Sequence, residues 1–247
     1  MAPSLWVRDK ELTAPIRELY ATPLTKGEIA FVYFGWAGIL LRTTDHVLAF
    51  DLCDVGFRRD EVDALARLDV HCYSHTHADH WHAPLAKAIQ KRTGVPMVVE
   101  PAIAEEGEVP AKDLVIARPG KLIAVGTISL TPITGVHPRP ITLFHARCKG
   151  PNGEVSLFHG ADSGYVPLAS LKADIAFVPT GMPSPSCSAE TAVAMVRDLG
   201  VRTAVAVHGS ASNMKAFKSL AEKEIPNVAL FFPKPCELVT VRVSRLA

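Results

Sequence analysis

Apolar runs of strand length alternate with amphipathic stretches along the whole chain. Runs typical of buried strands predict strands at residues 29–34, 38–42, 46–50, 69–73, 174–178, 203–207 and 227–232. Helical spacing predicts helices near residues 59–67, 81–92, 188–199 and 212–223, and a strand-rich stretch runs from about residue 113 to residue 159. Strands that alternate with helices in two similar halves predict two mixed sheets packed face to face, with the helices outside.

Length and composition favour one domain. The chain has 247 residues, of which 48% are hydrophobic, and this is enough for a single sizeable core. We therefore expect one domain over residues 1–247, with residues 1–27 as an N-terminal extension before the first strand. That extension would cover apolar surface, reach over a site or contact another subunit.

The net charge and the cysteine content indicate which binding partners and which cellular compartment to expect. The formal net charge of +1 gives no electrostatic reason to expect nucleic acid or an anionic membrane as the main partner. The longest apolar run, residues 29–41, is well short of the roughly 18 to 20 residues that span a bilayer. Five cysteines without a C-x-x-C pair suit reduced thiols in a cytoplasm. We expect a small-molecule substrate, and homo-oligomer formation stays open.

Histidines gather directly after the predicted strand at residues 69–73. On an extended or turning loop, His75 and His77 can converge on one cation, while Asp79 and His80 reach a second cation beside it. A helix would separate residues two apart by roughly 200°, so this spacing predicts a metal-binding loop. A solvated histidine-rich loop is the plainer alternative. His82 is left out of the site because we expect it in the first turn of the following helix.

Further ligands are expected at other strand ends, since a binuclear site needs about seven protein ligands. His137, Asp162 and His208 each stand just past the end of an apolar strand-like run, where a loop begins. Taken singly, residues of these types are more often structural than metal-binding. Their shared place at strand ends makes them the candidates for the remaining positions.

Together these residues follow the order His-x-His-x-Asp-His, then His, then Asp, then His, which resembles the metallo-β-lactamase superfamily from about Glu28 to Phe232. The closest similarity is to the branch typified by L-ascorbate-6-phosphate lactonase and related metal-dependent hydrolases. That branch has a glycine-aromatic turn between its first strands and then an Asp, matched here by residues 34–38 and Asp51. The resemblance implies an α/β fold, the four-layer αββα sandwich, with the metal site at one edge of the two sheets.

The resemblance also implies roles for the seven candidates. His75, His77 and His137 would hold one metal ion, while Asp79, His80 and His208 would hold the second, and Asp162 would bridge the two. Two divalent ions per chain are therefore expected, with Zn²⁺ favoured and Mn²⁺, Fe²⁺ or Co²⁺ fitting the same ligands.

The chain departs from the family pattern at several positions. Val136 and Pro138 flank His137 where glyoxalase-like members usually have Gly and Thr. Ala161 separates Gly160 from Asp162, although Asp162 is the only acid between residues 154 and 174. The motif has His-x-His rather than the His-x-Glu of the diiron flavoproteins, and no flavodoxin-like domain follows, so an oxygen-reducing role is disfavoured.

Five residues near the ligands are candidates for supporting or substrate-binding roles. By resemblance, Asp51 would hydrogen-bond the metal loop, although a turn-forming role at the strand end is equally open. Trp36 and Trp81 stand close in sequence to the glycine turn and to the histidine motif. Arg139 could meet a phosphate or carboxylate, or be a solvated loop charge. Tyr165 could donate a hydrogen bond to a developing oxyanion.

The expected activity is hydrolysis by a metal-bridging hydroxide, with Asp79 or Asp162 accepting the proton. Small phosphodiesters are the leading substrate class and lactones a close second, and turnover of both is expected because the same hydroxide attacks either centre. An RNA-processing-type nuclease of the same superfamily is an alternative, disfavoured by the lack of a basic stripe. A non-catalytic metal-binding protein is the alternative outside enzymes.

Overall fold

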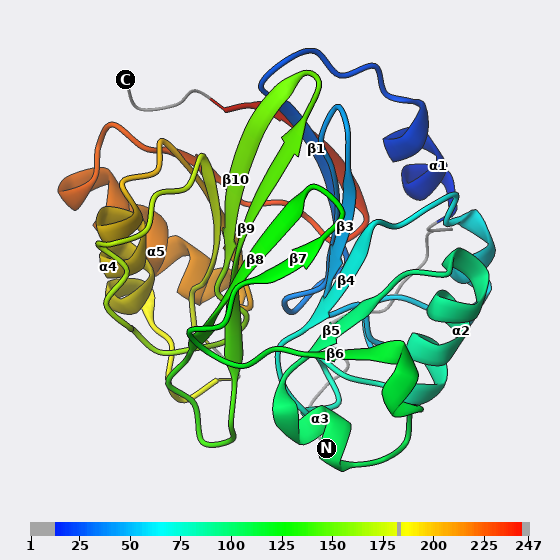
Figure 1. Ribbon diagram of the computed structural model, residues 1–247. Helices are drawn as coiled ribbons and strands as arrows, with labels where there is room; N and C mark the ends of the chain where they lie inside the picture. Colours follow the sequence, from blue (N-terminus) through cyan, green and yellow to red (C-terminus); the bar gives the residue numbers. More distant parts are fainter. Residues whose placement is uncertain (1–12, 182–183, 244–247) are drawn as a thin grey trace.

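Two mixed β-sheets pack face to face in the computed structural model, which describes residues 13–181 and 184–243 (Figure 1). In spatial order, the first sheet contains β14 (Glu237–Arg242), β1 (Glu28–Tyr33), β2 (Ile39–Arg42), β3 (Val47–Phe50), β4 (Val70–Tyr73), β5 (Met97–Val99) and β6 (Leu114–Ile116). The second contains β13 (Ala229–Phe231), β12 (Thr203–Val207), β11 (Ile175–Pro179), β10 (Gly153–His159), β9 (Thr142–Gly150), β8 (Ile128–Thr134) and β7 (Ile123–Val125).

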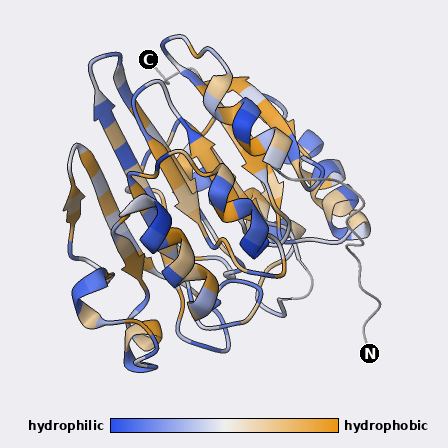
Figure 2. Ribbon diagram, turned by 90° about the vertical axis from the view of Figure 1, so that its right-hand side faces the viewer, coloured by the Kyte–Doolittle hydropathy of each residue, from blue (hydrophilic) through white to orange (hydrophobic). Residues whose placement is uncertain are grey.

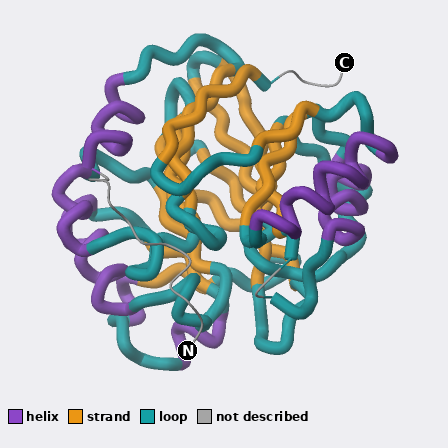
Figure 3. Tube along the Cα trace, turned by 180° about the vertical axis from the view of Figure 1, so that it is seen from behind, coloured by secondary structure: helices purple, strands orange, loops and turns teal. Residues whose placement is uncertain are grey.

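Helices cover the outer faces of both sheets (Figure 3). They are α1 (Thr13–Ala21), α2 (Ala83–Thr93), α3 (Pro101–Glu105), α4 (Ala189–Leu199) and α5 (Ala211–Glu224), together with the short 3₁₀ helices η1 (Arg59–Ala64) and η2 (Ala111–Asp113). Ser188 caps the start of α4 by accepting a hydrogen bond from the Thr191 amide, and Gly200 ends it in the left-handed conformation. The four-layer αββα sandwich expected from the sequence is thus confirmed.

The two sheets share one strand pattern. In the first sheet, antiparallel pairing joins β14, β1, β2 and β3, and parallel pairing continues through β4, β5 and β6. In the second, β7 to β10 are antiparallel and β10 to β13 parallel. Because the carboxyl ends of parallel strands meet at the same edge of a sheet, the loops after β3, β4, β10 and β12 gather at one edge of the sandwich.

The main core lies between the sheets. Its buried side chains come from both inner faces, and the rings of Phe31 and Phe177 meet edge to face across the gap with centroids 5.2 Å apart. Hydrophobic residues concentrate in the strands, and hydrophilic residues lie on the outward faces of the helices (Figure 2). In α1, Ile16 and Leu19 are fully buried against the outer face of the first sheet. This part of the N-terminal extension therefore covers apolar surface, while residues 1–12 lie outside the described part of the chain.

Some elements differ from the sequence expectation. The helix expected at residues 59–67 is the short 3₁₀ helix η1, and the helix expected at residues 81–92 begins only at Ala83. Strand β5, helix α3 and strand β14 were not expected, because segments of three to six residues with little polar alternation carry almost no periodic signal. None of the helices in the described ranges is both long and apolar enough to cross a membrane.

Candidate metal centre

The structure brings together all seven residues proposed as metal ligands. Their ligand atoms form two groups, and within each group all of these atoms lie within 4.8 Å of one another. The first group is His75, His77, His137 and Asp162, and the second group is Asp79, His80 and His208. The loop after β4 supplies four of the seven, and loops after β8, β10 and β12 supply one each.

Asp162 lies between the two groups. Its Oδ2 atom is 3.1 Å from His137 Nε2 and its Oδ1 atom is 3.8 Å from His75 Nε2, both in the first group. The same Oδ2 is 3.9 Å from the Nε2 atoms of both His80 and His208, in the second group. One carboxylate therefore faces both groups at once, which is the arrangement of a residue that bridges two cations.

In the second group, nitrogen atoms face each other at close range. The Nε2 atoms of His80 and His208 are 3.2 Å apart, and Asp79 Oδ2 is 3.7 Å and 3.4 Å from them respectively. Two imidazole nitrogens that face one another at this distance need either a shared proton or a cation. The convergence of both on one carboxylate oxygen suits a divalent cation.

Two of the buried donor atoms lack a hydrogen-bond partner. His75 and His80 are fully buried, and Asp162 is 2% exposed. His75 Nε2 and Asp162 Oδ1 are buried without any hydrogen-bond partner. An unpaired buried polar atom costs about 1–3 kcal/mol of stability. These two atoms would avoid that cost by coordinating a metal ion. Imidazole nitrogens with one or two carboxylates form a donor set that suits zinc and similar divalent metals.

Electrostatics favour positive charge in the second group. Burial alone would lower the pKa of His208, but the Asp79 carboxylate, the Cys187 thiol and the Asp162 charge raise it to about 10. Burial would raise the pKa of Asp79, but the hydrogen bond with His208 and the charges of His80 and His208 lower it to about 2. The carboxylates that favour a proton on His208 equally favour a cation there, and a metal ion would replace that proton.

The electrostatics of the first group differ from those of the second. Burial, and then the charge of His80, lower the pKa of His75 to about 3, so its ring is neutral and suited to donate an electron pair. For Asp162, burial raises the pKa, but the hydrogen bond with His137 and the charges of the neighbouring histidines bring it below its usual range. The first group therefore combines a neutral His75 imidazole with an ionised Asp162 carboxylate near neutral pH.

Asp51 holds the loop that carries the first four ligands. Its Oδ1 atom accepts a hydrogen bond of 2.8 Å from the Ser74 amide, and its Oδ2 atom accepts one of 2.7 Å from the Ser74 hydroxyl. Oδ2 is also 2.8 Å from His80 Nδ1. A carboxylate at Nδ1 fixes the proton there, which leaves Nε2 of His80 free to bind a cation.

Backbone strain is concentrated at this edge. All five non-glycine residues with positive φ in the described ranges lie here, namely Trp36 (51°), Asp51 (45°), Ala161 (49°), His208 (47°) and Cys236 (66°). Four of them are a ligand, a neighbour of a ligand, or a residue that bonds a ligand, and the Cys236 amide bonds the end of β1 at Tyr33. Strain of this kind persists where the surrounding structure over-determines the conformation, and it is commonest at functional sites.

Of the four residues proposed to bind substrate, two lie beside the ligand groups and two do not. The Trp36 ring lies 5.5 Å from the His208 ring, and its Nε1 atom is buried without a partner. Arg139 is exposed, with its guanidinium 3.3 Å from Thr76 Oγ1 and its amide 3.2 Å from His137 Nδ1. Both therefore border the ligand groups.

The other two residues have partners elsewhere. Trp81 is 6% exposed, and its indole N–H donates to Glu106 Oε2 at 2.9 Å. The Tyr165 hydroxyl donates to Asp198 Oδ2 at 2.8 Å, near the end of α4. The structure does not join either side chain to the ligand groups.

His82 is not in a helical turn, contrary to the expectation from the sequence. It is the extended residue that precedes α2, and its Nδ1 atom lies 3.4 Å from Asp54 Oδ2. The loop that carries the first four candidate ligands continues through Trp81 and His82 before the helix starts, because Pro84 favours the first helical turn rather than a later position. His82 nevertheless stays outside both ligand groups.

Several supporting residues were not identified from the sequence. The Ser74 hydroxyl lies 3.0 Å from His75 Nδ1, and the Cys53 thiol donates to the Asp79 carbonyl at 2.9 Å. The Ser163 hydroxyl accepts a hydrogen bond of 2.8 Å from the amide of Val136, next to His137. Ser74 and Ser163 each adjoin a predicted ligand, and this adjacency was the only available signal.

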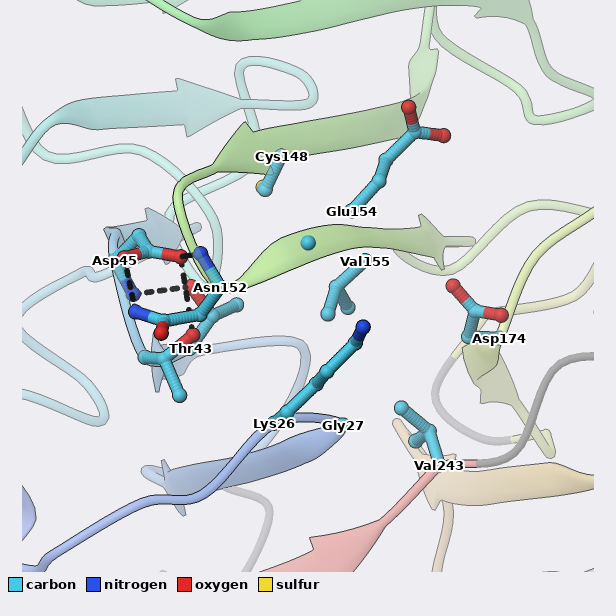
Figure 4. Close-up of a pocket in the computed structure, with 12 residues that line it drawn as sticks. Lys26, Gly27, Thr43, Asp45, Cys148, Asn152, Glu154, Val155, Asp174 and Val243 are labelled. Carbon is cyan, nitrogen blue, oxygen red and sulfur yellow. Dashed lines mark hydrogen bonds between the residues drawn. The ribbon is translucent and has the colours of Figure 1, made fainter.

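A separate cavity lies at the opposite edge of the sandwich. It has a volume of about 490 Å³ and is lined by Lys26, Asp45, Asn152 and Glu154 among others (Figure 4). These residues stand at the starts of β1, β3 and β10, so the strands separate this cavity from the ligand groups. None of the proposed site residues lines it.

Comparisons with known proteins agree with this geometry. The family model described as "Beta-lactamase superfamily domain" matches residues 54–209, more than half of the chain. A search of curated proteins finds no match.

Three solved structures illustrate the range of proteins with a similar fold. Igni18, a metallo hydrolase from the hyperthermophilic archaeon Ignicoccus hospitalis, is 15% identical with a TM-score of 0.68, over 88% of this chain and 100% of that chain. CmlA, a diiron β-hydroxylase from Streptomyces venezuelae, is 14% identical with a TM-score of 0.65, over 90% of this chain and 55% of that chain. A diphosphatase of the PhnP family is 13% identical with a TM-score of 0.58, over 87% and 98% respectively. At such identities the likeness concerns the fold.

Proposed function

Because the chain belongs to the β-lactamase superfamily, we propose that it is a binuclear metal-dependent hydrolase of small phosphodiesters, with lactones as the second substrate class. The observation that carries the proposal is the position of Asp162, whose carboxylate faces both ligand groups while Oδ1 has no hydrogen-bond partner. A single structural zinc site would need only about four ligands, whereas seven converge here.

The first group would hold one divalent cation and the second group the other, with Asp162 shared. When bound, such a pair lowers the pKa of a water molecule to about 7 and polarises a phosphoryl or carbonyl oxygen. Zn²⁺ suits the histidine-rich donors, and Mn²⁺, Fe²⁺ or Co²⁺ would fit the same set. The diiron centre named for CmlA makes iron a metal to test alongside zinc.

The two carboxylates would divide the remaining work. The Asp162 side chain is 3% exposed, which suits a fixed role between the groups. The Asp79 side chain is 23% exposed, so it can reach the attacking water or the leaving group. Its low pKa keeps it ionised, and we assign it the orientation of the water and the transfer of its proton.

Arg139 supports phosphodiesters as the leading class. Its exposed guanidinium lies 3.3 Å from Thr76 Oγ1, while its backbone amide contacts His137, and a guanidinium can bind two phosphate oxygens at once. The PhnP-family protein among the similar structures is a diphosphatase, an enzyme that acts on phosphate groups. Lactones stay the second class because attack on a carbonyl carbon needs the same activated water but no anion-binding residue.

The test is hydrolysis of a chromogenic phosphodiester by protein reconstituted with Zn²⁺, Mn²⁺ or Fe²⁺, run beside a simple lactone. His208→Ala removes a member of the second group, and His82→Ala removes a histidine of the same loop that lies outside both groups. We expect metal-dependent turnover that His208→Ala abolishes and His82→Ala retains. Turnover of the lactone alone would reassign the substrate class. Metal-loaded, folded protein that hydrolyses neither would contradict the proposal and favour a non-catalytic metal-binding role.

A further inference from the structure

Tyr33 ends β1 and lies outside both ligand groups. It is 1% exposed, and its hydroxyl donates a hydrogen bond of 3.0 Å to the backbone carbonyl oxygen of Trp36. The same carbonyl oxygen accepts a hydrogen bond of 2.8 Å from the backbone amide of His208. One oxygen atom of the first sheet's turn therefore receives both a buried tyrosine hydroxyl and the amide of a proposed metal ligand from the second sheet.

The turn that carries this carbonyl is built to stay in place. Gly35 has φ of 92° and Trp36 has φ of 51°, and the Phe34 amide donates to the Gly38 carbonyl at 2.8 Å. A Cβ atom on Gly38 would come within 3.3 Å of the Asp51 carbonyl oxygen, so the turn sits directly against the residue that orients His80. The turn thus contacts Asp51, which orients His80, and its Trp36 carbonyl accepts the hydrogen bond from the His208 amide.

A second buried side chain fixes the turn from the opposite sheet. His159 is fully buried at the end of β10, and its Nε2 atom is 2.9 Å from the Ala37 carbonyl oxygen. Its ring stacks on Phe50 with centroids 4.7 Å apart. Tyr33 and His159 therefore hold two consecutive carbonyls, those of Trp36 and Ala37.

His208 needs such support because its backbone is strained. Its φ of 47° is in the left-handed region, which a residue with a side chain rarely adopts. That conformation turns the imidazole toward His80, so that the two Nε2 atoms are 3.2 Å apart. If the Trp36 carbonyl shifted, the His208 amide would lose its partner and the backbone could relax, which would carry Nε2 out of position.

We propose that Tyr33 is a positioning residue for the second group: through the Trp36 carbonyl, its hydroxyl fixes the His208 backbone and thereby sets the affinity of that group for its cation. The proposal rests on the proposed function, in that the second group must bind a metal. Outer partners that orient metal ligands typically change metal affinity by about 10- to 100-fold when removed. Because the Tyr33 hydroxyl acts through a backbone carbonyl, we expect the low end of that range, about tenfold.

Tyr73 provides a matched control. It ends β4 in the same sheet and is fully buried, but its hydroxyl has no hydrogen-bond partner. Tyr33→Phe and Tyr73→Phe each remove one buried oxygen atom and keep the ring. Of the two oxygen atoms, the one of Tyr33 bonds the turn and the one of Tyr73 does not.

The experiment is titration of metal-free wild type, Tyr33→Phe and Tyr73→Phe with Zn²⁺ by calorimetry, with metal per chain counted after dialysis. We expect the wild type and Tyr73→Phe to bind two ions alike. Tyr33→Phe should bind the first ion normally and the second about tenfold more weakly. His159→Phe, which keeps the stacking on Phe50 but cannot donate to Ala37, should weaken the second ion in the same direction and serves as the test if Tyr33→Phe does not fold.

The outcomes separate the two proposals. A wild type that binds no metal would contradict the proposed function itself. A wild type that binds two ions, with Tyr33→Phe and His159→Phe indistinguishable from it, would overturn the positioning role and leave the proposed function standing. Equal weakening by Tyr73→Phe would also overturn it, because the effect would then come from the loss of any buried hydroxyl in this sheet.

Discussion

At one edge of the sandwich, strands end in loops whose backbone is strained and whose buried polar atoms lack partners, whereas at the opposite edge the turns pair their polar atoms. Trp36, Asp51 and His208 adopt positive φ at the first edge, and His75 Nε2 has no hydrogen-bond partner there. At the opposite edge, the Asp45 carboxylate accepts hydrogen bonds of 2.8 Å and 3.3 Å from the side chain and amide of Asn152 (Figure 4).

The two edges therefore have different roles. The opposite edge contributes contacts that stabilise the fold, and the first edge carries the two ligand groups. The polar contacts of the opposite edge join the two sheets, as His46 Nε2 and Thr127 Oγ1 also do at 2.7 Å. At the first edge, the unpaired atoms and the strain reduce the stability of the protein alone, and a bound cation would offset that cost. The comparison implies that substitutions at the first edge change activity more than stability, and that those at the opposite edge do the reverse.

The largest expected effect is that of Asp162→Ala. Because Asp162 faces both groups, its loss should lower kcat/KM more than about 100-fold on every substrate, beyond the range typical of outer partners. The folded state should survive, since the core between the sheets is untouched. Steady-state kinetics with reconstituted protein, together with thermal unfolding, would check both parts. An unchanged rate would remove Asp162 from the site.

His71 is a buried histidine that belongs to neither ligand group, and we expect it to affect the pH dependence of stability. It is fully buried, neither ring nitrogen has a partner, and burial lowers its pKa from 6.5 to about 3, although the Asp51 charge partly opposes this. Below pH 6.5 the unfolded chain binds a proton that the folded chain does not, so stability falls as the pH drops from 6.5 toward 3.

His71→Phe keeps an aromatic ring beside Tyr73, whose ring centroid lies 4.1 Å from that of His71. Between pH 7.5 and pH 5, the metal-free variant should lose about 2 kcal/mol less stability than the metal-free wild type. Urea unfolding at the two pH values measures the difference. Parallel pH profiles for the two proteins would show that His71 titrates normally in the folded state.

Arg139→Ala should produce a smaller, substrate-dependent loss. The guanidinium contacts Thr76 Oγ1 at the exposed side of the first group, and the backbone amide of Arg139, which the substitution keeps, contacts His137. We expect kcat/KM for an anionic phosphodiester to fall about tenfold, in the range of one charge-assisted hydrogen bond, with no change for a neutral lactone. An equal loss on both substrates would refute a role in anion binding.

The smallest effect on activity belongs to Asp45→Ala at the opposite edge. This change removes the acceptor of the two Asn152 hydrogen bonds and should lower the free energy of unfolding by about 1 kcal/mol. Activity per folded molecule should stay the same, because the strands separate Asp45 from both ligand groups. A loss of activity in fully folded protein would contradict the separation of the two edges.

The sequence was sufficient for the sandwich and for the convergence of the seven residues. Each of them lies in a loop after an apolar strand, and these strands end at one edge: β4, β10 and β12 have parallel neighbours, and β8 runs in the same direction as β10 because both are antiparallel to β9. His137 and His208 could be found in this way although they are far apart along the chain.

The remaining features depend on contacts between distant segments. Trp81 and Tyr165 donate to Glu106 and Asp198, partners 25 and 33 residues away that no local pattern indicates. The Tyr33 hydroxyl contacts a turn whose place depends on both sheets. Strand β14 pairs with β1 across nearly the whole length of the chain, and its half-exposed residues carry too little alternation to predict it.

The most direct test of the account is the number of divalent ions bound per chain. Wild-type protein reconstituted with Zn²⁺ and dialysed against metal-free buffer would be analysed for metal by mass spectrometry, beside Asp162→Ala. We predict two ions per wild-type chain and one or fewer in the variant. Folded wild-type protein that retains fewer than one ion, or a variant that retains two, would contradict the conclusion that Asp162 joins two groups of ligands into one binuclear centre.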